Sequence, residues 1–547
     1  MKIAFISLLE DVSIPSLRYL SAYLRARGHD TTLILLPWSF TDRAINDGNA
    51  FLYPYPDKVL EQVAEICSTA DMAGISMMTC HFDNAVHVTS FLRKRLPVPI
   101  IWGGIHPTLR PAECLEYADM ACVGEGEISV AQLASEMSDG KSWESLSIQG
   151  IHKRHTEQIT PSPITNNLDE LPFPDYDLDH HFILYKGNIV GLDNSLLARC
   201  LGHSYRTLFS RGCPYTCTYC CNDALRDLYQ HKLPVRWRTV DNRIKELKAA
   251  TNLMPELEEI TLADDAFLAQ SPALIKSFAA RYREEIGLPL TFITTPRSIS
   301  EPKLTPLAEA GLYSVGIGLQ SGSERIVKEL YSRPESLDEL ISASACIDKV
   351  SQKQGRQIIG RYDFILDNPW ESEQDVEASI RLGMQLKKPY FLALFSLTLY
   401  PGTELYRKAQ DEGIITDDLN QVYRRSQLVP KRTYLNGVFA ALSANAPNWM
   451  VALLLQKYIR RRSPVWVPYL VASIFEAAKL FKGLLGYAMR RDWKLIRFLL
   501  RWALSKLRFK LKIKKPGDGR PKFCGAPGEF CSNGDKIMKH GTQNGGS

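Results

Sequence analysis

Short apolar runs alternate with amphipathic stretches over the first 150 residues. Strand-like runs are predicted at Lys2–Leu8, Thr31–Leu36, Met72–Met77, Pro99–Trp102 and Met120–Val123. Helix-like periodicity lies between them, at Ser16–Arg27, Lys58–Ser68, Asn84–Arg95 and Ala112–Tyr117. Such alternation predicts an α/β domain with a parallel sheet covered on both faces, the doubly wound arrangement of Rossmann-like domains. Ligands of such sheets bind beyond the carboxyl ends of the strands.

A second series of alternating elements covers residues 205–425. Its strands are predicted at Thr207–Arg211, Glu259–Ala263, Leu290–Thr295, Ser314–Leu319, Arg361–Leu366 and Leu392–Leu399. Six such units predict a partial (β/α)6 barrel of the TIM type better than a closed eight-fold barrel. In barrels of this kind the chemistry takes place at the carboxyl ends of the strands.

Residues 151–204 are predicted to connect the two series, because the segment Asn167–Tyr176 holds prolines that favour extended backbone, with acids around them. Residues 426–515 show a mostly helical pattern dense in aromatic and basic side chains. Residues 516–547 are rich in Gly, Lys, Asn and Pro and are expected to be a disordered tail, in which Cys524 and Cys531 indicate no metal site.

The composition is that of a globular protein of two to four domains, with 547 residues, 45% hydrophobic and 23% charged. The net charge of +6 is uneven, because residues 457–515 carry 17 Lys and Arg against two acids, a local charge of +15 that leaves −9 for the rest. A basic helix that also carries Trp, Phe and Leu suits a membrane surface. The alternative is an amphipathic helix packed on the barrel with a solvated basic face.

Three cysteines stand within eight residues directly after the first strand of the second series. Cys213, Cys217 and Cys220 have the spacing C-x3-C-x2-C, and three thiolates on one loop can bind three irons of a 4Fe–4S cluster while the fourth iron stays open. Zinc sites favour paired C-x2-C knuckles with four ligands, and no second pair lies nearby. Disulfides fit poorly, because the cysteines are scattered and we expect no secretory leader.

The cysteine motif resembles the cluster loop of the radical S-adenosylmethionine (SAM) enzymes. The resemblance implies that the open iron chelates SAM and that an electron cleaves it to a 5′-deoxyadenosyl radical. It also places Tyr219 near the SAM adenine. Cys221 is then a spare thiol beside the motif.

The same resemblance implies SAM contacts at the ends of later strands. Asp264 and Asp265 follow the second strand, where an acid suits the methionyl ammonium. Arg297 follows the third strand, and Gln320 and Ser321 stand in a G-L-Q-S-G-S-E element after the fourth. A helix-capping role for Asp264 and Gln320 and a structural ion pair for Arg297 are the alternatives.

Two glycine-bearing loops end strands of the first series. One holds Gly103, Gly104, His106 and Thr108, and the other is the segment Val123–Glu127 with Gly124, Glu125 and Gly126. Either loop alone fits a structural turn. Ahead of a radical SAM loop they resemble the cobalamin-binding domain of cobalamin-dependent radical SAM enzymes. The D-x-H-x-x-G signature that supplies a histidine to cobalt is absent, so His106 is not assumed to be a cobalt ligand.

The resemblance implies hydrogen abstraction from an unactivated carbon and, most simply, its methylation through methylcobalamin. A non-methylating cyclase or rearrangement enzyme, an RNA-modifying radical SAM enzyme and a cobalamin sensor are the alternatives. We expect a small lipid-like or tetrapyrrole substrate and an electron donor such as flavodoxin or ferredoxin. We also expect peripheral membrane contact through residues 457–515, no nucleic-acid partner, and a cytoplasmic location.

Overall fold

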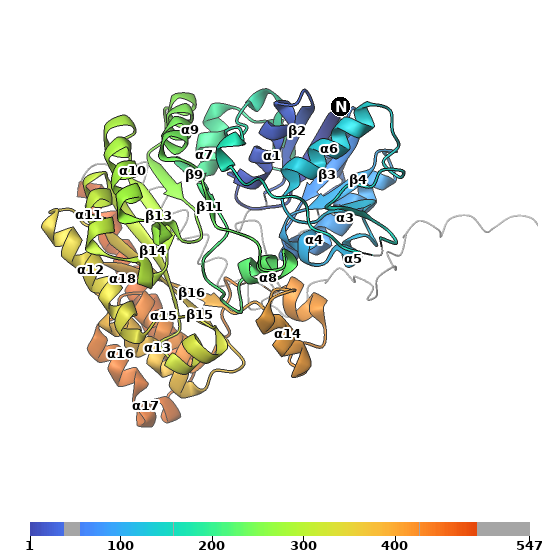
Figure 1. Cartoon of the computed structure of the whole chain (residues 1–547). Coiled ribbons are helices and arrows are strands. Elements are labelled where there is room, and N and C mark those ends of the chain that lie inside the picture. Colours follow the sequence, from blue (N-terminus) through green and yellow to red (C-terminus); the bar gives the residue numbers. More distant parts are fainter. Residues whose placement is uncertain (38–54, 157, 426, 490–547) are drawn as a thin grey trace, which may run out of the picture. The chain divides into compact units, whose positions relative to one another are not determined.

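The computed structural model describes residues 1–37, 55–156, 158–425 and 427–489 (Figure 1). The chain divides into two units, residues 1–483 and 484–547. Of the second unit only residues 484–489, the end of the last helix, are described.

The first sheet has eight strands in the order β6-β5-β4-β3-β1-β2-β7-β8. Five adjacent strands in it are the predicted ones: β1 (Lys2–Ser7), β2 (Asp30–Leu35), β3 (Met72–Ser76), β4 (Ile100–Gly103) and β5 (Met120–Cys122). They pair in parallel, and the helices between them include α1 (Pro15–Arg25), α2 (Asp57–Cys67), α3 (Phe82–Arg93), α4 (Ile105–Leu109), α5 (Pro111–Cys114) and α6 (Gly126–Ser138). Five of the six residues of β1 are buried, as expected of a strand covered on both faces. The predicted doubly wound sheet is confirmed.

The connector does more than link the two series. Residues 151–204 contribute β6 (Ile151–Lys153), β7 (His181–Tyr185) and β8 (Asn188–Gly191) to the first sheet, followed by α7 (Asn194–Leu201). β6 and β8 pair antiparallel with their neighbours and form the two edges of the sheet. The sequence pattern did not predict these strands, because the prolines of the segment indicated an extended connector.

The second sheet has six parallel strands in the order β16-β15-β14-β13-β12-β9. They are β9 (Ser204–Thr207), β12 (Glu259–Leu262), β13 (Leu290–Thr294), β14 (Leu312–Gln320), β15 (Ile359–Leu366) and β16 (Tyr390–Ser396). Helices α9 (Val240–Leu253), α10 (Pro272–Glu285), α11 (Glu301–Glu309), α12 (Leu337–Lys353) and α13 (Glu373–Gln385) lie between them in the chain. Among the described residues β16 does not pair with β9, so the six-stranded partial barrel is confirmed.

The first predicted strand of this sheet is in fact two strands. β9 ends at Thr207, and β10 (Ser210–Arg211) pairs antiparallel with β11 (Arg236–Trp237) in a separate ribbon. The chain therefore leaves the barrel sheet just before the cysteine loop.

The segment after the barrel is helical as far as it is described, with α14 (Glu404–Asp411), α15 (Tyr434–Ser443), α16 (Asn448–Leu455), α17 (Lys457–Arg462) and α18 (Trp466–Met489). The predictions for 490–515 and for the tail 516–547 lie outside the described residues. Within the described part of the chain, no helix is both long and apolar enough to cross a bilayer.

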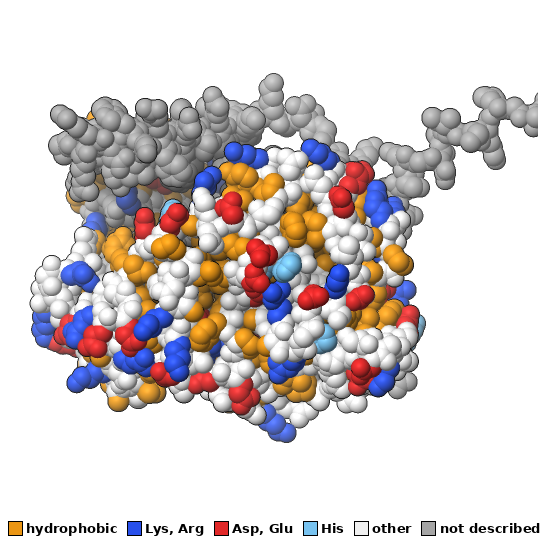
Figure 2. All heavy atoms as spheres, turned by 90° about the horizontal axis from the view of Figure 1, so that it is seen from above, with side chains coloured by type: hydrophobic (Ala, Val, Ile, Leu, Met, Phe, Trp, Pro, Cys, Tyr) orange, Lys and Arg blue, Asp and Glu red, His pale blue; other side chains and the backbone are white. Residues whose placement is uncertain are grey.

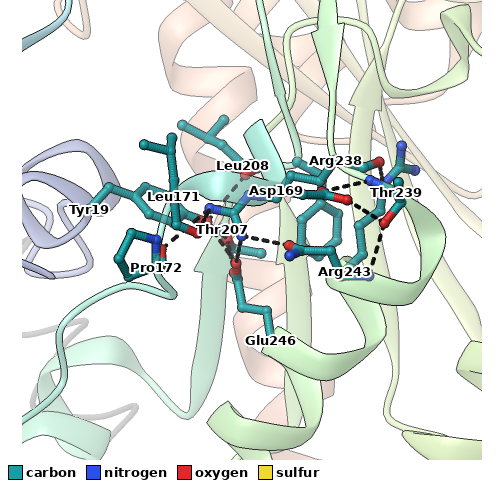
Figure 3. A network of polar contacts seen from close by, with 12 residues as sticks. Tyr19, Asp169, Leu171, Pro172, Thr207, Leu208, Arg238, Thr239, Arg243 and Glu246 are labelled. Carbon is teal, nitrogen blue, oxygen red and sulfur yellow. Dashed lines mark hydrogen bonds and ion pairs between the residues drawn. The ribbon is translucent and has the colours of Figure 1, made fainter. Parts of the chain in front are cut away.

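A buried polar network joins the first sheet's helix α1 to the barrel (Figure 3). The carboxylate of Glu246 on α9 accepts hydrogen bonds from the hydroxyls of Tyr19 (2.8 Å) and Thr207 (2.5 Å) and pairs with Arg238 at 3.3 Å. Arg238 also donates to the carbonyl oxygens of Leu171 and Pro172 in the connector, both at 3.4 Å. One buried carboxylate thus fixes three parts of the chain that lie far apart in sequence.

Candidate active site

The cysteine loop lies between β10 and α8 (Cys221–Leu228), and Cys213, Cys217 and Cys220 are all half-buried on it. It begins with Gly212, whose φ of +89° is a conformation that side chains disfavour, and a Cβ there would lie 3.1 Å from the carbonyl oxygen of Pro234. Arg226 then holds the start of the loop by donating to the carbonyl oxygen of Cys213 at 2.9 Å.

The middle of the loop is fixed by Thr218, which is buried between two later segments of the barrel. Its backbone N–H donates to the carbonyl oxygen of Tyr331 (3.3 Å) and its hydroxyl to that of Leu330 (2.6 Å). Its own carbonyl oxygen accepts from the N–H of Leu405 (2.9 Å). The thiols are therefore presented on a loop that is bonded along its length.

The three thiols act on one another electrostatically. Burial, together with the charges of Asp265, Cys220 and Cys217, raises the pKa of Cys213 to about 12. Burial likewise raises the pKa of Cys217. Three thiolates held together without a cation repel, so bound iron would relieve the repulsion, and the donor set fits a cationic iron–sulfur cluster. Among the described residues no three His, Cys, Asp or Glu side chains are arranged around a single ion, whereas cluster ligands each bind a different iron.

The two acids after β12 have different surroundings. Asp264 is fully buried and accepts hydrogen bonds from the N–H of Phe209 at 2.9 Å and from the hydroxyl of Ser210. Burial raises its pKa to about 6. Asp265 is exposed, accepts from Asn222 at 2.9 Å, and lies close enough to Cys213 to raise the pKa of that thiol. Asp264 therefore supports the strand before the cysteine loop, and Asp265 is the acid that faces the mouth of the barrel.

Gln320 and Ser321, like the two acids, are neighbours in sequence with different surroundings. Gln320 ends β14 with φ at +69°, next to a break in the register with β15, and strain of this kind concentrates at binding sites. Ser321 is fully buried, with its hydroxyl 3.2 Å from both Glu371 Oε1 and Ser379 Oγ. Ser321 thus supports the loop while Gln320 remains half-buried at the strand end.

Tyr219 and Arg297 have different partners. The Tyr219 ring packs edge-on against Tyr331, with centroids 4.8 Å apart. The Arg297 side chain is 52% exposed and pairs with Glu339 at 3.2 Å, which is the structural ion pair foreseen as its alternative role.

Arg333 is a buried cation beside the cluster loop that sequence reasoning did not single out. It donates to the carbonyl oxygen of Gly318 at 2.8 Å, pairs with Glu335 at 3.2 Å, and its charge acts on Cys217 and Tyr219. No local pattern marks it, because it stands 12 residues beyond Ser321 and only the fold returns it to the strand end.

The glycine-bearing loops line one cavity of about 350 Å3 at the carboxyl edge of the first sheet. Among its lining residues are Gly103, Gly104, Thr108, Gly124, Glu125 and Gly126, together with Leu208, Ser210 and Arg211 from the start of the barrel domain. Thr108 joins the two loops, because its hydroxyl donates to the carbonyl oxygen of Gly104 (2.8 Å) and accepts from the N–H of Gly124 (3.0 Å).

The glycines shape this cavity by lacking side chains. A Cβ on Gly104 would lie 2.5 Å from the carbonyl oxygen of Met77, at φ +107°, so the loop itself requires glycine there. At Gly103 and Gly126 a Cβ would make only ordinary contacts, at 3.9 and 3.5 Å. Their bare backbone therefore leaves room in the cavity. Its walls include the apolar side chains of Phe5, Leu17 and Val130, and a cavity of this kind fits part of a large ligand such as cobalamin.

His106 is not among the residues that line the cavity. It is 1% exposed, 3.2 Å from Thr79 Oγ1 through Nδ1, and packed between the rings of Phe82 and Tyr423. Burial, together with the charge of Arg110, lowers its pKa to about 3. The structure thus places this predicted cofactor-binding residue in the core behind the glycine loop.

Glu125 links the cavity to the cysteine loop. Its carboxylate pairs with Arg211 at 2.8 Å and accepts from Arg236 at 3.1 Å, while Arg211 also pairs with Glu127 at 2.5 Å. Burial alone would raise the pKa of Glu125, but the two arginines hold it below its usual value. Arg211 stands two residues before Cys213, so the loop of the first sheet is bonded to the strand that carries the thiols.

Comparison with known proteins agrees with both halves of the site. Residues 1–134 match the B12 binding domain, and residues 207–382 match the radical SAM superfamily. The chain belongs to the cobalamin-dependent radical SAM enzymes. The cofactors of this family, a 4Fe–4S cluster, SAM and cobalamin, are those that the three thiols, the strand ends and the glycine-lined cavity fit.

Relatives and solved structures cover most of the chain. An uncharacterized methyltransferase of Pyrococcus horikoshii, PH0819, is 27% identical over 62% of this chain and 69% of its own length. The cytidylyl-2-hydroxyethylphosphonate methyltransferase of Streptomyces wedmorensis is 24% identical over 75% of this chain and 79% of its own. The structure of OxsB, a cobalamin-dependent S-adenosylmethionine radical enzyme with aqua-cobalamin bound, superimposes with a TM-score of 0.59 at 14% identity, covering 94% of this chain and 80% of that one. At that identity the superposition shows the fold alone.

Proposed function

We propose that this protein is a cobalamin-dependent radical SAM methyltransferase that methylates an unactivated carbon of a small apolar substrate. One observation carries the proposal: the glycine-lined cavity and the cysteine loop adjoin through Ser210 and Arg211, which line the cavity and stand directly before Gly212 and Cys213. A methyl donor in the cavity and a radical source on the loop could then act on one substrate. The relatives described above, both named methyltransferases, favour methylation over cyclisation.

The chain's own residues bind, orient and exclude water. Cys213, Cys217 and Cys220 would hold the cluster, and Asp265 would accept hydrogen bonds from the ammonium group of SAM. Glu125 and its arginine partners fix the cofactor loop against the thiol-bearing strand. When bound, the cluster supplies the electron that cleaves SAM, and cobalamin supplies the methyl group.

The test is anaerobic reconstitution of the full chain with iron, sulfide and hydroxocobalamin, followed by reduction with dithionite and incubation with SAM carrying a deuterated methyl group. We expect about four irons per chain, 5′-deoxyadenosine, and transfer of the label into a product from lipid extracts. Cys346→Ala, a matched half-buried cysteine on α12, should leave all three readouts intact.

Three results would overturn or redirect the assignment. SAM cleavage without methyl transfer, in every extract that yields a modified product, would favour a non-methylating reaction. About eight irons per chain would favour an RNA-modifying enzyme with an auxiliary cluster. A chain that binds cobalamin but cleaves no SAM would favour a sensor.

For delivery of electrons we propose flavodoxin or ferredoxin, and for location the cytoplasm. Ten described cysteines are free thiols, and both they and an iron–sulfur cluster are suited to a reducing compartment. Pull-down of reduced flavodoxin by the reconstituted enzyme, with dithionite-independent turnover, would support this partner.

A further inference from the structure

The helices α16 to α18 present a second apolar surface that packs on nothing among the described residues. α18 buries one face: Pro468 and Ala472 are covered, and Val467, Val471 and Phe475 pack against the barrel core. A Cβ on Gly437 would lie 2.8 Å from Pro468, so α15 and α18 are in close contact. This helix therefore already buries one apolar face against the protein, as an amphipathic surface helix does.

The opposite face of α18 is apolar as well. Trp466, Leu470, Ile474 and Phe481 are exposed, and at 100° per residue they lie within an arc of roughly 80°. Trp466 is 61% and Phe481 68% exposed. On α16, Trp449 and Leu453 are exposed one helical turn apart, and Tyr458 on α17 is exposed too. The exposed apolar side chains of α18 lie along one face of that helix, and apolar exposure of this kind marks an interaction site.

Cations accompany this stripe. Lys457, Arg461 and Arg462 on α17 are exposed, and none of the ion pairs formed among the described residues uses them. Arg460, by contrast, forms ion pairs with Glu373 and Glu377 of α13. On the face shown in Figure 2, by contrast, acidic and basic side chains are interspersed among apolar ones. Over the described residues 457–489, six Lys and Arg stand against one acid, Glu476, so the helices that carry the exposed apolar side chains are also basic.

We propose that the exposed stripe of α16–α18 docks on the surface of an anionic lipid bilayer. Trp and Tyr rings have an apolar body and a polar edge, which suits the headgroup region, and cations beside an apolar face attract anionic lipids. A second copy of this chain would bring like charges together, and so would the basic segment 490–515, so a lipid surface fits the charge better than either. If the substrate is apolar, as in the proposed function on which this step rests, docking would bring the barrel to the membrane that holds it.

The experiment is sedimentation of the full chain with vesicles of phosphatidylcholine alone, or of phosphatidylcholine with roughly 30% phosphatidylglycerol. The second composition gives the vesicle a strongly negative surface. We expect at least tenfold stronger binding to the anionic vesicles, and a marked loss in 0.5 M salt, where screening shortens the reach of charge to a few ångströms. Quenching of tryptophan fluorescence by brominated lipid tests insertion on the unaltered protein.

Matched variants separate the two components. Trp466→Ser with Phe481→Ser should reduce vesicle binding at least tenfold, whereas Tyr313→Ser with Phe391→Ser, which are also exposed aromatic side chains but lie on the barrel sheet, should not. Arg461→Gln with Arg462→Gln should abolish the preference for anionic lipid, and Lys94→Gln with Lys276→Gln should keep it. Unaltered folding is checked by circular dichroism.

Several outcomes would overturn the proposal. They are equal binding of the wild type to neutral and anionic vesicles, no lipid quenching, and full binding by the Trp466/Phe481 variant. A dimer in light scattering that those two substitutions dissociate would assign the stripe to a second copy instead. SAM cleavage in detergent-free solution should be unchanged in all these variants, so failure here is distinguishable from failure of the catalytic assignment.

Discussion

The two sheets build their halves of the active site by opposite means. The first sheet makes its cavity by omitting side chains, at Gly103, Gly104, Gly124 and Gly126. The second presents ligands, with three thiols on a bonded loop and Asp265 and Gln320 at strand ends. A large cofactor needs room and backbone contact, whereas a metal cluster needs donors, and parallel strands offer both at their carboxyl ends.

The two sides should therefore respond to different kinds of substitution. On the thiol side, deleting a group removes a bond that nothing else supplies. On the glycine side, adding a group blocks space, and the loss depends on how far the loop can yield.

The largest effect is expected at the thiols. Cys213→Ala should lower the rate of SAM cleavage by at least ~10³-fold, since two remaining thiols cannot hold the cluster in its working geometry. Iron content and 5′-deoxyadenosine measure it. Equal cleavage by Cys213→Ala and by the control Cys346→Ala would break the comparison on this side.

Glu246 joins the two halves and should matter for stability. Glu246→Ala leaves Arg238 buried without its carboxylate, which should lower the free energy of unfolding by about 3–5 kcal/mol. Asp241→Asn on the same helix, an exposed partner of Lys245, should show no measurable change. Denaturant melts of both variants decide, and similar midpoints would show that the network does not hold the halves together.

Asp264 predicts a pH dependence of stability. Its pKa rises from 3.8 to about 6 on folding, so between these values the native state binds the extra proton. Stability from this group is therefore greatest at low pH and falls as pH rises through about 6, by on the order of 3 kcal/mol. Asp264→Asn keeps an acceptor for Phe209 N–H and should remove this component. Parallel pH profiles for variant and wild type would contradict it.

The glycine side should respond less strongly. Gly104→Ala places a methyl group against the Met77 carbonyl at positive φ, which costs about 1–3 kcal/mol and should weaken hydroxocobalamin binding about ten- to a hundredfold. Cluster content should be unchanged. Gly28→Ala, also at positive φ but with open space around it, is the control, and equal weakening in both would show that the cavity has no special need of glycine.

The smallest effect is expected at Arg297. Its exposed pair with Glu339 adds little in water, so Arg297→Ala should change SAM cleavage by less than twofold. A rise of tenfold or more in the apparent KM for SAM would instead indicate that Arg297 contacts SAM, as the sequence predicted.

The sequence alone determined the two sheets, the thiol triad and the two glycine loops, because each depends on local spacing. Hydrophobic periodicity marks buried strands, and C-x3-C-x2-C is readable within eight residues. The sequence could not distinguish the surroundings of Asp264 from those of Asp265, or show where His106 lies, because adjacent residues on a turn can face opposite ways. The strands β6, β7 and β8 were missed for a different reason, since they lie in a segment whose prolines indicated an extended connector.

Only the tertiary structure decided which polar groups meet. Arg211 with Glu125, Arg333 with Cys217, and Glu246 with Tyr19 are separated by tens to hundreds of residues, and their pairing follows from strand order. The exposed stripe on α18 was likewise decided by packing, because a helix apolar on two faces does not say in sequence which face the core will take. Local spacing fixes candidate ligands, whereas burial and partners depend on where distant segments come together.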